Sequence, residues 1–420
     1  MTKEHIVKDI SLAPQGKVDV EWAERHMPVL LSIRKRFEAE KPLKGMRIAA
    51  CLHVTKETAV LMRTLRAGGA EVALCASNPL STQDEVAAAL AADGFKVYAV
   101  KGMDNTLYYE CLNSVLDIKP TITIDDGADL INAIHSKRQD LIPNLIAGQE
   151  ETTTGVIRLK AMAKAGALKY SVIAVNDTPT KHMFDNHYGT SQSTIDGIIR
   201  ATNELLAGKV FVVVGYGFCG KGLARGADGL GAKVVVVEVN AVEALKAHLD
   251  GFQVMTIADA AKVGDIFCTV TGNKHVIRGE HFKAMKDGAV VCNSGHFDIE
   301  LNLKELDAMK KSKRELMPLV EEYVLDNSHR VIVLAQGRLV NLACAKGHPS
   351  EVMDMSFSDQ ALCSEYIAKN GGSFKEKRVY DVPASIDETV AKLKLKAHGL
   401  GLDTFTAEQV EYMNSYTEGT

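Results

Sequence analysis

A glycine-rich turn between two apolar segments is the strongest chemical signal in the chain. Residues 210–240 read VFVVVGYGFCGKGLARGADGLGAKVVVVEVN, which predicts a strand, a turn, a helix and a second strand. Gly215 permits the tight turn, Gly217 lets the backbone approach a pyrophosphate, and Gly220 lets helix and strand pack closely. The N–H groups that open the helix would face the phosphates. The pattern predicts a dinucleotide site.

An acidic residue ends the second strand of this motif. Glu238 lies 18 residues after Gly220, near the roughly 20 residues expected for a carboxylate that binds the ribose hydroxyls. Because a carboxylate there repels a 2′-phosphate, the motif favours NAD over NADP. The alternative is a glycine-rich turn in some other α/β protein.

Polar residues gather at four strand ends before this motif. They are His53, Thr55 and Glu57 after RIAAC; Asp125 and Asp126 after TITI; Glu150, Glu151, Thr152, Thr153 and Thr154 in GQEETTTG; and Asn176, Lys181, Asp185 and Asn186 after SVIAV. Each cluster alone is explained as a helix cap or a turn. Together, opposite a dinucleotide lobe, they predict an active site.

Two of these residues have a spacing that suits shared chemistry. Lys181 and Asp185 are four apart, so in a helix they share a face and can both reach one hydroxyl. His296 in CNSGHFD and His348 in AKGHPSE lie in predicted loops. Neither has metal-ligand spacing, and we predict no metal site.

Strand and helix signals alternate twice along the chain, which predicts parallel sheets covered on both faces. A helix is expected over residues 18–40. The fold class is α/β, with two Rossmann-like doubly wound parallel-sheet domains facing a cleft and a small C-terminal helical tail. The predicted domains are substrate-binding (1–185 and 349–383), NAD-binding (190–345) and a C-terminal tail (384–420).

Composition narrows the class of protein. The 420 residues are 46% hydrophobic and 24% charged, with a net charge of −4 and no block of like charge. This charge distribution gives no electrostatic reason to expect binding to nucleic acid or to a membrane surface. No signal peptide or membrane span is predicted. Eight scattered cysteines without a CxxC pair favour free thiols in the cytoplasm.

An ordered set of motifs resembles S-adenosylhomocysteine hydrolase. The motifs are CLHVTKETAVL, STQD, DDGADL, EETTTGV, NDTPTKHMFDNHYGT, GYGFCGKG, CNSGHFDIE and GRLVNLACAKGHPSEVM. The resemblance implies an NAD-dependent, usually tetrameric enzyme that reversibly cleaves S-adenosyl-L-homocysteine to adenosine and L-homocysteine. It also implies the chemistry: oxidation at the ribose 3′-carbon, elimination of homocysteine, water addition and reduction.

The resemblance further implies residue roles. Lys181 and Asp185 would contact the 3′-hydroxyl with His296 close by, Asp126 would act at C4′, and His53 at C5′. Glu151 and Thr152 would hold the 2′-hydroxyl, and Thr55, Glu57, His348, Met353 and Phe357 would surround the purine. The implied NAD-binding set is Thr152, Thr153, Thr154, Asn176, Asn186, Gly215, Gly217, Phe218, Cys219, Gly220, Glu238, Asn240, Thr271, Asn273, Ser294, Gly295, His296, Asn341 and His348.

Several positions depart from the family pattern. Phe218 and Cys219 replace Asp and Val, and Asn240 replaces Asp. The chain lacks the terminal Lys and Tyr of many members, so we expect NAD to exchange more readily. Lys56, Lys346 and Glu351 stand beside the purine motifs, which leaves S-inosyl-L-homocysteine as an alternative substrate. An inactive NAD-binding regulator and an ordinary dehydrogenase are further alternatives.

Overall fold

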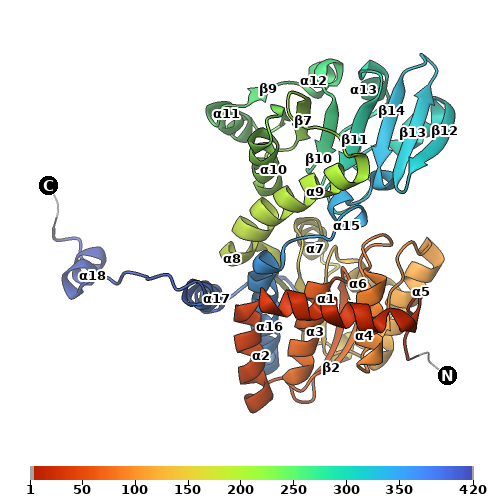
Figure 1. Ribbon diagram of the computed structural model, residues 1–420. Coiled ribbons are helices and arrows are strands. Elements are labelled where there is room, and N and C mark those ends of the chain that lie inside the picture. Colours follow the sequence, from red (N-terminus) through yellow and green to blue (C-terminus); the bar gives the residue numbers. More distant parts are fainter. Residues whose placement is uncertain (1–3, 419–420) are drawn as a thin grey trace.

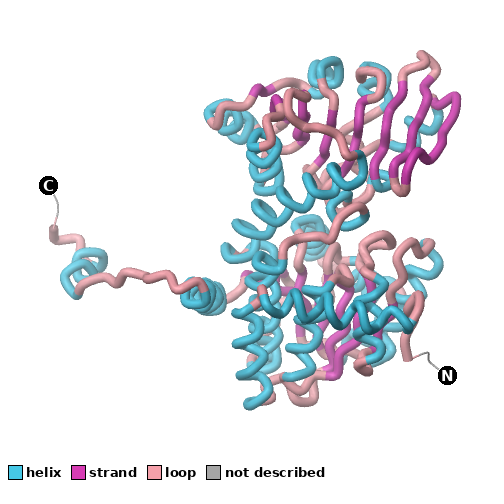
Figure 2. The backbone as a smooth tube through the Cα atoms, in the orientation of Figure 1, coloured by secondary structure: helices cyan, strands magenta, loops and turns pink. Residues whose placement is uncertain are grey.

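The computed structural model describes residues 4–418, which form two α/β lobes and a projecting tail (Figure 1). Figure 2 shows the strands gathered into two separate sheets. The first sheet contains β1 (Arg47–Leu52), β2 (Glu71–Ala76), β3 (Lys96–Tyr98), β4 (Ile122–Asp125), β5 (Ala147–Glu150), β6 (Val172–Ala174) and β15 (Val379–Asp381). The second contains β7 (Val210–Val214), β8 (Lys233–Val237), β9 (Gln253–Val254), β10 (Ile266–Thr269), β11 (Ala289–Asn293), β12 (Lys310–Met317), β13 (Val320–Leu325) and β14 (Arg330–Leu334).

Helices cover both sheets. Those of the first lobe are α1 (Ala13–Arg25), α2 (Pro28–Glu40), α3 (Lys56–Ala67), α4 (Asp84–Ala92), α5 (Asn105–Val115), α6 (Asp129–Ser136), α7 (Thr153–Lys164), α8 (Pro179–Lys181), α16 (Ser350–Lys369) and α17 (Ala384–Ala397). Those of the second lobe are α9 (Thr190–Thr202), α10 (Phe218–Gly229), α11 (Ala241–Leu249), α12 (Ile257–Val263), α13 (Gly279–Ala284), α14 (Leu303–Ala308) and α15 (Val340–Ala343), and α18 (Ala407–Asn414) lies in the tail. No helix within residues 4–418 combines the length and hydrophobicity needed to cross a bilayer.

The first sheet is entirely parallel, in the order β15-β6-β5-β4-β1-β2-β3. Its central strands are buried on both faces because they are almost wholly apolar, as in Arg47–Leu52. The order turns back beside β1, and ligands bind at such a switch point. The polar strand ends described above therefore lie along one edge.

The second sheet runs β12-β13-β14-β11-β10-β7-β8-β9. Its pairs are parallel except for β12–β13 and β13–β14, which are antiparallel. The sequence prediction missed the β12–β13 hairpin. Strand β12 is exposed along most of its length and rich in Lys and Arg, so it lacks the apolar alternation that marks a strand. Charged side chains are typical of a sheet edge that must avoid pairing with another chain.

Two helices replace the single helix expected over residues 18–40. α1 ends at Arg25 and α2 begins at Pro28, because a proline inside a helix removes a hydrogen bond and clashes with the preceding turn. The interruption turns α2 against α3 and α16.

The chain passes between the lobes twice, from α8 to α9 and from α15 to α16 (Figure 1). The first passage contains a π-helical segment, His182–Gly189. A π-helix is rare and is often found at functional sites. Both passages border the space between the two sheets.

Candidate active site

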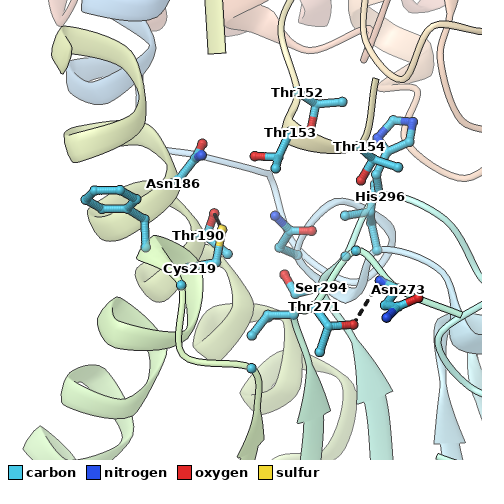
Figure 3. A pocket seen from close by; sticks show the side chains of 18 of the residues that line it. Thr152, Thr153, Thr154, Asn186, Thr190, Cys219, Thr271, Asn273, Ser294 and His296 are labelled. Atoms are coloured by element: carbon cyan, nitrogen blue, oxygen red, sulfur yellow. Dashed lines mark hydrogen bonds between the residues drawn. The ribbon is translucent and has the colours of Figure 1, made fainter. Parts of the chain in front are cut away.

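A cavity of about 730 Å³ lies between the lobes, within the range of sites for small molecules and cofactors. Most predicted site residues line it: His53, Thr55, Asp126, Glu151, Thr152, Thr153, Thr154, Lys181, Asp185, Asn186, Gly215, Gly217, Phe218, Cys219, Glu238, Thr271, Asn273, Ser294, Gly295, His296, Asn341, His348, Met353 and Phe357. Figure 3 shows Thr152, Thr153 and Thr154 facing Thr271 and Ser294 across it. Six predicted residues are outside the lining: Glu57, Asp125, Glu150, Asn176, Gly220 and Asn240.

The Lys181 ammonium is the centre of a buried polar cluster. Its Nζ donates to Asp185 Oδ1 at 3.0 Å, to Asn186 Oδ1 at 2.7 Å and to Asn176 Oδ1 at 3.3 Å. The π-helical segment explains why two successive residues can both reach it: the wider turn brings the side chains at i+4 and i+5 to the same side as Lys181. The helical spacing predicted the pairing with Asp185 but not the second contact.

Charge compensation sets the ionisation of this cluster. Burial alone would lower the pKa of Lys181, but the charges of Asp185 and Glu151 outweigh burial and raise it. Burial alone would raise the pKa of Asp185, yet Lys181 and His348 hold it well below its usual range. Burial raises the pKa of Glu151 to about 7, although Lys181 opposes that shift. Lys181 and Asp185 are therefore charged at neutral pH, and Glu151 can gain or lose a proton.

Two side chains of α16 hold the Glu151 carboxyl group. The Ser356 hydroxyl donates to Oε1 and the Gln360 amide donates to Oε2, while Lys181 Nζ lies 3.7 Å from Oε1. All four groups are buried. Sequence reasoning missed Ser356 and Gln360, which lie about 200 positions from Glu151 and belong to no recognised motif.

Asp126 lies between two imidazole rings. Its Oδ2 is 3.4 Å from His53 Nε2, and its Oδ1 is 3.4 Å from His296 Nδ1. Gly127 has a φ of +106°, and a Cβ there would collide with the His296 ring. A glycine at this position therefore allows the second lobe to bring its histidine against the first lobe.

Two serine hydroxyl groups hold the Nδ1 side of the His53 ring. Its Nδ1 lies 2.8 Å from Ser81 Oγ and 3.1 Å from Ser77 Oγ. The Ser81 hydroxyl also lies 3.1 Å from the Asn78 carbonyl oxygen, to which it can donate. Burial lowers the pKa of His53 to about 4, more than the Asp126 charge raises it. A neutral imidazole therefore lies beside the Asp126 carboxyl group.

These three residues also have the types and proximity of metal ligands. The ligand atoms of His53, Asp126 and His296 all lie within 4.8 Å of one another. The sequence spacing predicted no metal site because the three residues come from separate segments. Sequence spacing did not detect this grouping, and the expectation of no metal site stays a prediction.

Two further carboxyl groups support the strand ends. Asp125 and Glu150 are register partners on β4 and β5 and are fully buried. Asp125 accepts from the backbone N–H of Asp126 and Ile131, and Glu150 accepts from that of Gly127 and Thr152. Burial raises the pKa of Asp125 to about 8 and that of Glu150 well above its usual value. These groups position the loops that carry Asp126, Glu151 and Thr152.

The glycine turn has the shape of a phosphate cradle. Gly215 has a φ of +108°, and a Cβ on Gly220 would collide with the Gly215 carbonyl. A Cβ on Gly217 would meet open space. The Glu238 carboxylate accepts from the Tyr216 N–H at 2.6 Å, which brings the end of β8 against the turn. Asn240 lies beyond it and caps α11.

One buried acceptor in the cavity fits an amide ligand. Asn341 donates from Nδ2 to Ser193 Oγ at 3.2 Å, whereas its Oδ1 is buried without a hydrogen-bond partner among residues 4–418. An unsatisfied buried acceptor costs about 1–3 kcal/mol, so a donor such as a carboxamide group would stabilise it. The turn, Glu238 and Asn341 together fit NAD.

The buried Glu300 carboxylate holds the Thr271–Gly272 segment of the cavity wall in the second lobe. Glu300 is 1% exposed and accepts from the backbone N–H groups of Thr271 and Gly272 at 3.0 and 2.7 Å. It also accepts from the Thr271 hydroxyl at 2.7 Å. Glu300 is the last residue of the CNSGHFDIE motif and was not among the predicted site residues.

The His348 imidazole joins the Lys181 cluster from the second passage between the lobes. Its Nε2 lies 3.5 Å from Asp185 Oδ1, and its Nδ1 lies 3.0 Å from Ser193 Oγ. The sequence prediction placed His348 beside the purine and in the NAD-binding set but did not predict these two contacts. The side chain therefore connects the predicted purine end of the cavity with the predicted ribose end.

Known proteins share both halves of this arrangement. One family profile, S-adenosyl-L-homocysteine hydrolase, matches residues 4–149, and another, S-adenosyl-L-homocysteine hydrolase, NAD binding domain, matches residues 186–347. The adenosylhomocysteinase of Aquifex aeolicus is 59% identical over 99% of both chains. That of Saccharolobus solfataricus is 57% identical over 99% of both, and that of Thermococcus kodakarensis is 55% identical over 100% of this chain and 99% of the relative.

Proposed function

The chain belongs to the S-adenosyl-L-homocysteine hydrolase family, and we propose that its interlobe cavity hydrolyses S-adenosyl-L-homocysteine to adenosine and L-homocysteine. The observation that carries this proposal is the buried Lys181 cluster beside the glycine turn. It sets a charged ammonium and a proton-exchanging carboxyl group where the two lobes meet.

NAD is the cofactor, and when bound it supplies reversible oxidation at the ribose 3′-carbon. The chain's part in that step is electrostatic. Lys181 remains an ammonium and stabilises negative charge on the 3′-oxygen, while Asp185 and Asn186 fix its position. Glu151, with a pKa of about 7, is the member of the cluster that can hold the hydroxyl proton.

Elimination at C5′ needs a proton to move from carbon to sulfur. A 3′-ketone makes the C4′ proton acidic, and we assign its removal to Asp126. We assign the proton of neutral His53 to Nδ1, so that Nε2 can accept this proton from Asp126 across 3.4 Å. Protonated His53 then gives it to the departing homocysteine thiolate. In the second half His53 takes a proton from water as the water oxygen adds to C5′. His53 passes this proton back across the same 3.4 Å to Asp126, which delivers it to C4′. His296 supports Asp126 from the second lobe.

The test is thiol release with NAD supplied. We expect homocysteine from S-adenosyl-L-homocysteine, slower release from S-inosyl-L-homocysteine, and no net NADH. Steady NADH formation would indicate an ordinary dehydrogenase, and no thiol from either compound would indicate an NAD-binding regulator.

Further properties are proposed with the same function. We propose the domain limits 1–185 with 349–383, 190–345 and 384–420, and a homotetramer. Exposed apolar side chains on the tail, Phe405, Tyr412 and Met413, support assembly. We also propose a cytoplasmic location, which the eight free cysteines support.

A further inference from the structure

Glu57, which does not itself line the cavity, lies behind the end of it that the proposed function gives to the purine. That end is lined by Thr55, Thr58, Leu342, Met353 and Phe357, a set that combines apolar walls with hydroxyl groups. Glu57 belongs to the first turn of α3, which Thr55 caps, and is 1% exposed. A nearly buried carboxylate at a helix N-terminus is favoured by the helix dipole but still needs a partner.

Two donors converge on one oxygen of Glu57. Lys56 Nζ lies 2.6 Å from Oε1, and the Ser350 hydroxyl donates to the same oxygen at 2.6 Å. Ser350 opens α16, so the contact joins α3 to the second passage between the lobes. Both of these contacts use Oε1, and neither uses Oε2.

The backbone around Lys56 is also held in place. The Lys56 N–H donates to Gln83 Oε1 at 3.2 Å, and Gln83 Nε2 donates to the Lys346 carbonyl at 3.1 Å. One amide therefore ties the segment of Lys56 to the segment that carries His348. The Lys56 side chain is only 17% exposed, which limits its freedom to turn into solvent.

Lys346 has a different environment, although it is the other lysine near the purine motifs. Its ammonium pairs with Glu85 at 3.2 Å, and its side chain is 58% exposed. A surface pair of this kind contributes little. Lys346 thus serves as a matched control for Lys56.

We propose that Lys56 is a specificity-determining residue, which anchors Oε1 of Glu57, directs Oε2 toward the purine and so makes the site select a six-amino purine over a six-oxo purine. The inference rests on the proposed nucleoside thioether substrate. An ionised carboxylate has no proton to donate, so its free oxygen accepts from a six-amino group and repels a six-oxo group.

Without the ammonium, a buried charge would be left uncompensated. When Ser350 alone holds Oε1, the carboxyl group can rotate, so Oε2 no longer keeps one position and the preference between the two purines falls. Lys56 therefore acts through Glu57 rather than by touching the substrate.

The experiment compares Lys56→Met, Lys56→Arg and Lys346→Met in the NAD-loaded full chain. The readout is the ratio of kcat/KM for S-adenosyl- over S-inosyl-L-homocysteine, with the dissociation constants of adenosine and inosine as a second readout. We expect Lys56→Met to lower both preferences at least tenfold. Lys56→Arg and Lys346→Met should stay within threefold of the unaltered protein.

Three results would overturn the inference. One is an equal loss on both substrates in Lys56→Met with the preference intact, as a purely structural residue would give. The second is an equal loss of preference in Lys346→Met. The third is a preference of the unaltered protein for the inosyl compound. If Lys56→Met does not fold, a tenfold change of preference in Lys56→Arg would also contradict it. Thiol release from neither compound by the unaltered protein would instead refute the proposed function.

Discussion

The reactive residues differ in what their surroundings do to their protons. Lys181 and Asp185 compensate each other and remain charged, whereas Glu151 and His53 are shifted toward their neutral forms by burial. The charged Lys181, held in place by Asp185, can stabilise an oxyanion, whereas Glu151 and His53 can donate and accept protons. Substitutions of neighbouring residues should therefore affect different properties, turnover for Lys181 and the pH dependence of stability for Glu151.

Replacing Lys181 should abolish oxidation at the 3′-carbon. We expect Lys181→Ala to lower kcat by about 10²–10⁴-fold, the usual contribution of a positioned proton-transfer or charge-stabilising group. Thiol release measures turnover, and single-turnover absorbance of the reduced cofactor measures the first step. The exposed Lys160, replaced by Ala, is the control. Near-normal turnover in Lys181→Ala would refute the assigned roles.

Glu151 should make stability depend on pH. Its pKa is 4.5 in the reference state and about 7 when folded, so its stabilising contribution is complete below pH 4.5 and is lost as pH rises through 7. Between pH 5 and 8, the Tm of Glu151→Gln should therefore rise relative to that of the unaltered protein. Glu38→Gln, on an exposed position of α2, should show no such trend. Parallel Tm curves for Glu151→Gln would contradict the buried, protonated form.

At the scale of elements, the site depends on turns that only glycine can form. Gly220→Ala places a Cβ against the Gly215 carbonyl, and backbone must shift to admit it. We expect a loss of about 1–3 kcal/mol in the free energy of unfolding, together with weaker NAD binding. Gly217→Ala adds its Cβ in open space and should weaken NAD binding alone. Thermal unfolding and cofactor titration separate the two, and equal destabilisation in both would be evidence against this account.

Some elements of the site could be predicted from the sequence, and others could not. The glycine turn and the parallel strands were predictable because their signals are local. The π-helical turn that brings Asn186 to Lys181, and the reach of Ser356 and Gln360 from α16 to Glu151, depend on tertiary packing. The strand-end clusters could be placed along one edge, but the pairing of His296 with Asp126 needed the second lobe.

For the whole molecule, several contacts join the two lobes around the cavity. Lys101 Nζ donates to the Ala343 carbonyl at 3.0 Å, and Leu80 of the first lobe packs against Ala335 and Ala343 of the second. His296 and Asp126 meet across the same gap. Catalysis therefore requires the two lobes in this relative position, and any surface that holds the lobes together from outside would favour it.

The tail is the surface that we expect to hold several copies together. It leaves the body beyond α17 and exposes Leu402, Phe405 and Met413 to solvent (Figure 1). Exposed apolar side chains gathered on one segment indicate a contact with another protein surface. Removal of residues 401–420 keeps α17 in place and should weaken self-association at least tenfold, as measured by sedimentation velocity. Phe405→Asp with Met413→Asp, in the full-length chain, should act in the same direction. If the shortened chain sedimented like the unaltered one over the same concentrations, assembly would have to depend on surfaces of the two lobes.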